Sequence, residues 1–349
     1  MLNKYQQLSF AVLRILYQIA NSLGFCFFTY DPHKNQIIDC RVKRITWIVF
    51  RIIVLISFPY SMFIVEKNYA DNEDVYSSAN LKILLVVMTT GSTLNLCYQI
   101  WSNDEILRVC NGFLDILENL HVSGKTSMIF DRNFVTLLLL KCLTSFHEFF
   151  AEIPIYLILG DVTYGNIVCL IITIYMNLLI SYAVTIYFIG NLIIGKIYAK
   201  LSTDLQLLLN ESQLWEHFNN RSIDERFSET FKLFEEIYKI AVGFKSILQI
   251  NLLSWLLYTV INNLVTYYHP IFKIIVGEVV SIHSMLFGIK LTLDIILLMV
   301  AIDMAYRNSR ISNNYLLILH GRGPQSLELE LNVSVLFFLC FPDCKVDCK

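Results

Sequence analysis

Long apolar runs recur along the chain and are separated by shorter polar segments. A helix needs about 20 mostly apolar residues to cross a bilayer, and six runs have that length and character. They cover residues 45–65, 81–101, 134–159, 162–195, 249–268 and 284–305. The pattern therefore predicts an all-α, polytopic membrane helix bundle with six full spans.

The fourth run differs from the others because residues 162–195 contain no charged side chain at all. At 1.5 Å per residue this run would be about 50 Å long, which exceeds a hydrocarbon core of about 30 Å. We therefore expect one helix that continues past the membrane into the connection at residues 196–248. Apolar residues at helical spacing extend it there, namely Ile197, Leu201, Leu205 and Leu208.

A second helix is predicted in the same connection, after a break at Asn219 and Asn220. Ser222 and Glu225 form a capping-box pattern that opens it. Apolar residues then recur in a heptad-like stripe, formed by Phe227, Phe231, Phe234, Tyr238 and Ala241. The stripe either packs within one chain or belongs to a cytoplasmic platform that joins subunits, and the sequence leaves both interpretations open.

The N-terminal segment, residues 1–44, contains an apolar stretch at residues 8–29 that resembles a signal peptide or an additional span. No small-residue cleavage site follows it, and Arg14, Gln18 and Asn21 interrupt the stretch. We therefore predict an amphipathic helix that packs at the cytoplasmic face.

Composition supports a membrane protein and excludes several classes of soluble protein. Hydrophobic residues make up 56% of the 349 residues, and charged residues only 16%, against about 25% charged residues in an ordinary soluble domain. A net charge of −2 gives no positive electrostatic potential that would attract nucleic acid. The chain is therefore expected to contact membrane lipid and no nucleic acid.

Lysine and arginine predict the orientation of the spans because cytoplasmic segments are enriched in them. They lie in residues 1–44, in the second connection, in residues 196–248 and in residues 306–349, whereas the other three connections contain only Lys67 and Lys273. The N-terminus is therefore predicted to be cytoplasmic. Spans one to four then occupy residues 45–195, and spans five and six occupy residues 249–305.

Enzyme and metal motifs are absent from the sequence. It has no phosphate-binding loop, no zinc-protease motif and no nucleophile elbow. Three cysteines cluster near the C-terminal end (Cys340, Cys344 and Cys348), but a zinc site would need a fourth ligand. We expect a reduced cytosolic tail, no catalytic residue, no metal and no cofactor.

Ionisable residues inside the predicted spans are informative because they are costly in a membrane. Span one contains Arg51, and span three contains Lys141, His147, Glu148 and Glu152. Span six contains Lys290 and Asp294, which are one helical turn apart and able to neutralise each other.

These charges allow two interpretations. They are either ion pairs that hold the bundle together, or they line a wet cavity that opens to the outside and binds a small polar or amphipathic ligand. In the second case Glu148, Glu152, Lys290 and Asp294 are candidate ligand-binding residues. Aromatic and amide side chains in the outer halves of the spans would complete the lining, namely Tyr156, Asn177, Tyr258, Asn262 and Tyr267.

The N-terminal residues resemble a known family. Leu23-Gly24, Phe28 and Tyr30-Asp31, followed by the basic residues Arg41 and Arg44, resemble the segment that precedes the first span of insect gustatory receptors. The acidic-leucine stretch at residues 327–331 is similar to the one that leads into the last span of those receptors. The long fourth helix and the extended connection after it also match.

The resemblance implies a seven-span, ligand-gated cation channel that is opened by tastants in the plasma membrane of sensory neurons. It also implies a homo- or hetero-oligomer with other gustatory receptors, expected to be a tetramer. The resemblance leaves three alternatives open, which are a truncated modulatory subunit of a full-length receptor, a receptor of the G-protein-coupled type and a transporter.

The chain departs from this family near its C-terminal end. About nine apolar residues, at positions 333–341, follow Leu331 before Pro342, which is less than half of a span. The Thr-Tyr and Gln-Phe signature of the family's pore helix is also absent. The sequence thus predicts an incomplete seventh span, a chain truncated before its pore helix, and no ligand-evoked current when the chain is expressed alone.

Overall fold

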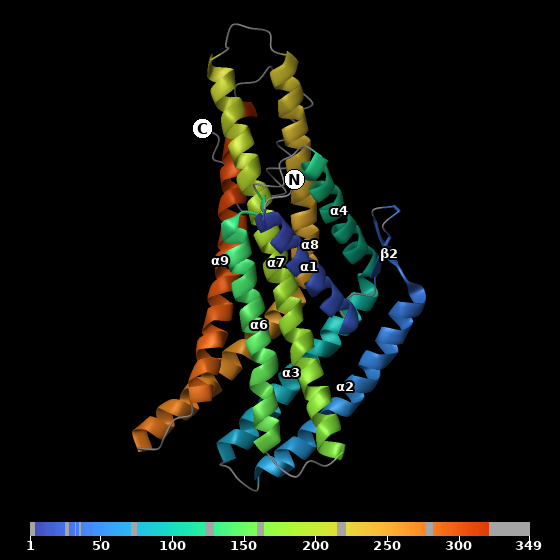
Figure 1. The fold of residues 1–349 in the computed structure, drawn as a ribbon, viewed down its shortest axis with the longest axis vertical. Coiled ribbons are helices and arrows are strands. Elements are labelled where there is room, and N and C mark those ends of the chain that lie inside the picture. Colours follow the sequence, from blue (N-terminus) through green and yellow to red (C-terminus); the bar gives the residue numbers. More distant parts are fainter. Residues whose placement is uncertain are drawn as a thin grey trace, which may run out of the picture.

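The computed structural model describes residues 4–24, 28–31, 33–34, 36–70, 75–122, 129–158, 164–214, 221–276 and 282–320. It is an elongated bundle of long helices (Figure 1). The first half contains α1 (Lys4–Ser22), a hairpin of β1 (Phe28–Asp31) and β2 (Gln36–Asp39), α2 (Arg41–Ala70), α3 (Val75–Trp101) and α4 (Asn103–Val122). The second half contains α6 (Arg132–Ile158), α7 (Tyr164–Leu214), α8 (Arg221–Val276) and α9 (Ile282–His320).

The apolar runs that predicted the six spans are helical wherever the structure describes them, and they belong to α2, α3, α6, α7, α8 and α9. The prediction of one continuous helix from the fourth run into the connection is confirmed, because α7 has 51 residues. Within the described chain, one stretch, Ile167–Asn210, is long and apolar enough to cross a membrane. For the other five runs, crossing stays a prediction.

The outer surface of the bundle is apolar along the predicted spans. In α2, Val54 and Phe58 are buried, whereas a row of large apolar side chains is exposed: Ile45, Val49, Ile52, Ile53, Ile56, Tyr60 and Phe63. Water would make such a surface costly, whereas lipid acyl chains would cover it. The surface of α2 is therefore suited to a bilayer.

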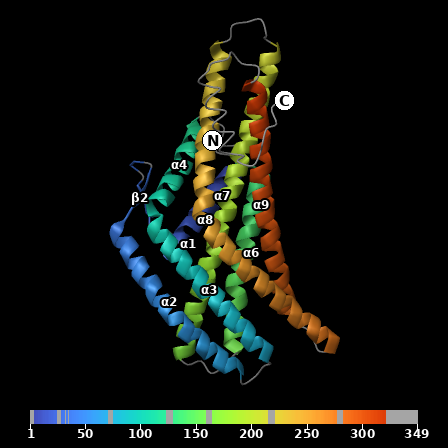
Figure 2. The same cartoon turned by 180° about the vertical axis from the view of Figure 1, so that it is seen from behind.

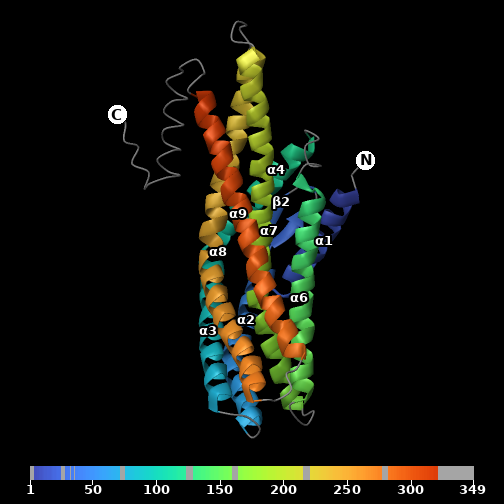
Figure 3. The same ribbon diagram turned by 90° about the vertical axis from the view of Figure 1, so that its left-hand side faces the viewer.

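Helix α7 is central and packs closely against α9 (Figures 2 and 3). The two helices approach at Gly195, where an added Cβ atom would lie 3.0 Å from the backbone nitrogen of Ala305. The Asn308 side-chain amide donates to the carbonyl of Gly195 at 2.9 Å, and the hydroxyls of Ser202 and Ser312 are 2.7 Å apart. Small residues thus allow close contact, and interhelical hydrogen bonds hold it.

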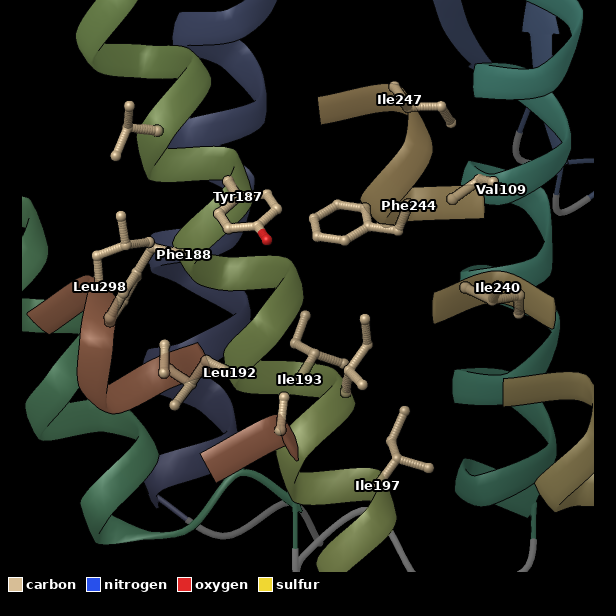
Figure 4. Close-up of a cluster of buried hydrophobic side chains, with 14 of the residues drawn as sticks. Val109, Tyr187, Phe188, Leu192, Ile193, Ile197, Ile240, Phe244, Ile247 and Leu298 are labelled. Carbon is tan, nitrogen blue, oxygen red and sulfur yellow. The ribbon is translucent and has the colours of Figure 1, made fainter. Parts of the chain in front are cut away.

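The aromatic ring of Phe244 joins α8 to two other helices. It stacks on Tyr187 of α7 with ring centroids 5.7 Å apart (Figure 4), and it meets Phe113 of α4 edge-on, also at 5.7 Å. A Cβ atom at Gly190 would overlap the Phe244 ring. The absence of a side chain at Gly190 therefore creates the space that the ring fills.

The connection that was predicted to be helical consists of extensions of α7 and α8. The four predicted apolar residues of α7 are all buried, namely Ile197, Leu201, Leu205 and Leu208. Helix α8 begins at Arg221, one residue before the predicted cap Ser222, which is itself helical. The predicted break at Asn219 and Asn220 lies outside the described residues.

At least part of the aromatic stripe of α8 packs against other residues of the same chain. Phe234 is buried, and its ring packs against Tyr198 of α7 with centroids 5.7 Å apart. Phe227 and Phe231 contact each other at 6.4 Å, and Tyr238 is half-buried. A platform that joins subunits stays a prediction.

Neither α4 nor the hairpin was predicted from the sequence. The predicted helix at residues 8–29 is shorter in the structure, since α1 ends at Ser22 and Gly24 follows with φ of 65°. Glycine adopts this conformation without a Cβ penalty, and the ring of Trp47 lies directly against it. The chain then turns into the antiparallel hairpin β1–β2.

Residues of the resemblance motif hold this N-terminal region together. The Lys43 ammonium donates to the side-chain oxygen of Asn21 and to the carbonyl of Phe28, the latter at 3.1 Å. Arg44 pairs with Asp39 at 2.7 Å. The hydroxyl of Tyr175, on α7, donates to the carbonyl of Leu23 at 2.9 Å. The motif therefore joins α1, the hairpin, α2 and α7.

The side chain of Asn111 on α4 binds the hairpin. The Asn111 amide accepts from the backbone N–H of Ile37 at 2.7 Å and donates to the carbonyl of Ile37 at 3.0 Å, as a neighbouring strand would. Asn111→Leu removes both bonds, and we expect the free energy of unfolding to fall by about 1–2 kcal/mol. Thermal unfolding of the purified protein measures the change.

The matched control is Asn191→Leu on α7. The bonds that the structure gives the Asn191 side chain go to the carbonyl and to the side chain of Tyr187, in its own helix, and that carbonyl keeps its backbone partner without Asn191. A loss of stability as large as that of Asn111→Leu would contradict the proposed role of Asn111.

Candidate functional site

Three charged side chains meet inside the bundle, between α6 and α9. The Lys141 ammonium lies 2.6 Å from Oδ1 of Asp294, and the Lys290 ammonium lies 3.0 Å from Oδ2. The exposed fractions of these side chains are 2% for Lys141, 3% for Asp294 and 5% for Lys290. We call Lys141, Asp294 and Lys290 the buried ionic cluster.

Hydroxyl groups extend this cluster across three helices. Thr144 donates to Oδ1 of Asp294 at 2.6 Å, and Ser145 donates to the carbonyl of Lys141 at 3.0 Å. The Ser145 hydroxyl is also 3.3 Å from the hydroxyl of Thr185 on α7. A continuous polar path therefore runs from α9 through α6 to α7.

Pairing is the reason that these charges are tolerated. Removing an ion from water into a protein interior costs several kcal/mol, and only close pairing with further hydrogen bonds offsets that cost. Asp294 receives two ammonium groups and one hydroxyl. The described members of the cluster are therefore ion-paired, Lys141 with Asp294 between α6 and α9 and Lys290 with Asp294 within α9, as in the first of the two interpretations drawn from the sequence.

The candidate lining residues are not all brought to the cluster. Tyr267 of α8 donates to the carbonyl of Gly288 at 2.8 Å, and its hydroxyl is 2.6 Å from that of Thr292. Gly288 and Thr292 are each two positions from Lys290, which places them on the opposite side of α9. Tyr267 therefore joins α8 to α9 and does not face the cluster.

The structure describes the side chains of two further lining candidates, and those of the other four lie outside the description. Tyr258 is buried in the core and Asn177, on α7, is half-buried. Four candidates lie on helices whose backbone is described while their side chains lie outside the description, namely Glu148, Glu152, Tyr156 and Asn262. Their participation in ligand binding stays a prediction.

Lys141 was noticed as a charge within a predicted span, but its pairing with Asp294 and the role of Thr144 were not predicted from the sequence. Also not predicted was a group of uncharged polar side chains inside α3 and α8, which includes Ser92, Asn95 and Thr259 and is buried. The available signal was the presence of hydroxyl and amide side chains near the centres of predicted spans. No group of three metal-ligating side chains occurs among the residues that the structure describes.

Comparison with known families agrees with the resemblance seen in the sequence. A sequence model of the 7tm chemosensory receptor family matches residues 13–339. This match includes all six predicted spans, the connection between α7 and α8, and the buried ionic cluster. No curated protein matches the chain.

Proposed function

Because the chain belongs to the 7tm chemosensory receptor family and is thus a membrane chemoreceptor, we propose that it is a gustatory receptor subunit of the ligand-gated cation channel type. In this proposal a small tastant binds between the helices. The subunit acts in an oligomer, a tetramer by resemblance, in the plasma membrane of sensory neurons.

The buried ionic cluster carries this proposal. Ionisable groups inside a membrane bundle are costly and usually mark a functional region. The cluster joins α6 to α9 through Lys141 and Asp294, so a ligand that separates these helices changes the energy of the pair. A receptor needs such a sensitive contact between its ligand and the rest of the chain.

Helix α9 supplies a route from the cluster to the opposite end of the bundle. Beyond Asp294 it packs on α7 at Gly195 and continues to the Ser202–Ser312 contact. Both helices are continuous over this distance. A displacement of α9 at the cluster would therefore move the extension of α7, which belongs to the connection where the subunit platform is predicted.

A thermal-shift screen of the purified protein in lipid nanodiscs tests the proposal. The panel contains uncharged compounds (glycerol, sorbitol and glucose), amines (butylamine and benzylamine) and carboxylates (butyrate and benzoate). We expect at least one compound to raise the melting temperature saturably, since a ligand at 100 times its Kd stabilises a protein by about 2.7 kcal/mol.

Two matched variants link this binding to the cluster. Lys290→Met changes a buried lysine that pairs with an acid one turn away, whereas Lys239→Met changes an exposed lysine that pairs with Glu235 in the same way. The shift is expected to diminish in Lys290→Met and to persist in Lys239→Met. A panel without any saturable shift, or equal behaviour of the two variants, would contradict the proposal.

A further inference from the structure

A second set of buried polar atoms has no hydrogen-bond partner among the residues that the structure describes. It consists of the hydroxyl oxygens of Thr89, Ser92 and Thr259 and the side-chain oxygen Oδ1 of Asn95. Ser92 and Asn95 are at most 5% exposed, and Thr259 is completely buried. Since about nine in ten buried polar groups in proteins are paired, four unpaired atoms on two helices are unusual.

Other hydroxyl groups on α3 and α7 show the usual hydrogen bond of a Ser or Thr side chain within a helix. Hydroxyls inside helices usually donate to the carbonyl four residues earlier. Thr93, Thr173 and Thr185 do so, at 2.7, 2.9 and 3.0 Å. In the part of the chain that the structure describes, Ser92 and Thr259 do not, so the hydrogen-bonding capacity of their hydroxyl groups is unused.

The packing of the helices places these atoms at one level of the bundle. Val109 and Gly112 of α4 face Gly243 and Ile240 of α8, which defines an antiparallel arrangement. Helix α3 leads into α4, and it packs along the continuation of α8 (Figures 2 and 3).

Ser92 precedes Val109 by nearly the same number of residues as Thr259 follows Gly243. Asn95 follows Ser92 by just under one turn. Both helices rise equally per residue, and α3 packs on α8, so this count places the two polar groups at a similar level of the α3–α8 pair.

We propose that Thr89, Ser92, Asn95 and Thr259, together the α3–α8 polar layer, bind an uncharged ligand that carries hydroxyl or amide groups. This inference rests on the proposed function and names its ligand class. Hydroxyls both donate and accept, and the Asn95 oxygen accepts. The side chains of this layer carry no charge, whereas the charged side chains of the buried ionic cluster already pair with one another. The hydrogen bonds that remain to be made are therefore those of uncharged groups.

The variant Thr259→Val tests the inference because valine keeps the shape of threonine and removes its hydroxyl. Binding of glycerol, sorbitol and glucose is measured by titration against the melting temperature. We expect binding of the uncharged compounds to weaken about tenfold, the effect of losing one hydrogen bond. The ligand-free protein should melt at the same temperature or higher, since its buried hydroxyl has no partner to lose.

Thr173→Val is the matched control, because Thr173 is also buried but its hydroxyl is bonded within α7. Its affinity for the uncharged compounds should be that of the wild type. If Thr259→Val lowers the melting temperature of the ligand-free protein and leaves affinity unchanged, the hydroxyl serves the fold and the inference is wrong.

The same titrations separate this inference from the proposed function. Saturable binding of the amines or carboxylates alone, unaffected by Thr259→Val, would overturn the uncharged ligand class and leave the receptor proposal standing. Binding of no compound in the panel would overturn both.

Discussion

Asp294→Ala is expected to lower the free energy of unfolding by about 3–5 kcal/mol, because it leaves two buried lysines without their carboxylate. Lys141 and Lys290 both pair with Asp294, and Thr144 loses its acceptor as well. A loss of this size also reduces the yield of folded protein. Thermal denaturation in detergent, followed by size-exclusion chromatography, measures it.

The same helix offers a matched control for this variant. Asp303 also pairs with a basic residue one turn away, Arg307, but both side chains are more than half exposed. Exposed pairs of this kind contribute at most about 1 kcal/mol, so Asp303→Ala should melt close to the wild type. Similar losses in Asp294→Ala and Asp303→Ala would show that burial of the cluster does not determine its importance.

Gly195→Leu is expected to destabilise the protein by about 3 kcal/mol through overpacking of α7 against α9. The added Cβ atom would lie 3.0 Å from the backbone nitrogen of Ala305. Because that neighbour is backbone and not a flexible side chain, the helices must separate. Separation also weakens the bond from Asn308 to the carbonyl of Gly195. Chemical or thermal unfolding of the purified variant measures the loss.

Gly165→Leu provides the comparison on the same helix. An added Cβ atom at Gly165 meets no atom of the described residues within 4 Å, and replacing a helical glycine stabilises a helix by about 0.5–1 kcal/mol. Gly165→Leu should therefore unfold at or above the wild-type temperature. If both leucine variants lose the same stability, the contact between Gly195 and Ala305 does not hold α7 to α9.

Helix positions could be predicted from the sequence because long apolar runs have few other stable forms in a membrane protein. The i, i+4 spacing of Lys290 and Asp294 predicted that they could neutralise each other, and they are paired. The involvement of Lys141 could not be predicted in this way. Lys141 and Asp294 are far apart in the chain, and only the packing of α6 on α9 brings them together.

Helix α4 and the hairpin were not predicted from the sequence, for different reasons. Helix α4 had an available signal, because Ile106, Val109, Phe113, Ile116 and Leu120 recur at helical spacing. The hairpin had a weaker one. Its strands have four residues each, and part of its pairing comes from the side chain of Asn111, which is remote in the sequence.

The N-terminal motif shows how a resemblance acquires a physical basis. Gly24 is required by a positive φ angle and by the ring of Trp47, and Arg44 pairs with Asp39. Neither contact is visible in the spacing of the motif residues. The motif is therefore a set of contacts that fixes the start of α2 against α1 and the hairpin.

The most direct test of a ligand site between the helices is hydrogen exchange, measured by mass spectrometry with and without the panel compound that gives the largest thermal shift. The receptor account predicts added protection in the predicted spans of α3, α6, α8 and α9, around Ser92, Lys141, Thr259 and Asp294. Protection confined to the extensions of α7 and α8, with these segments unchanged, would contradict it.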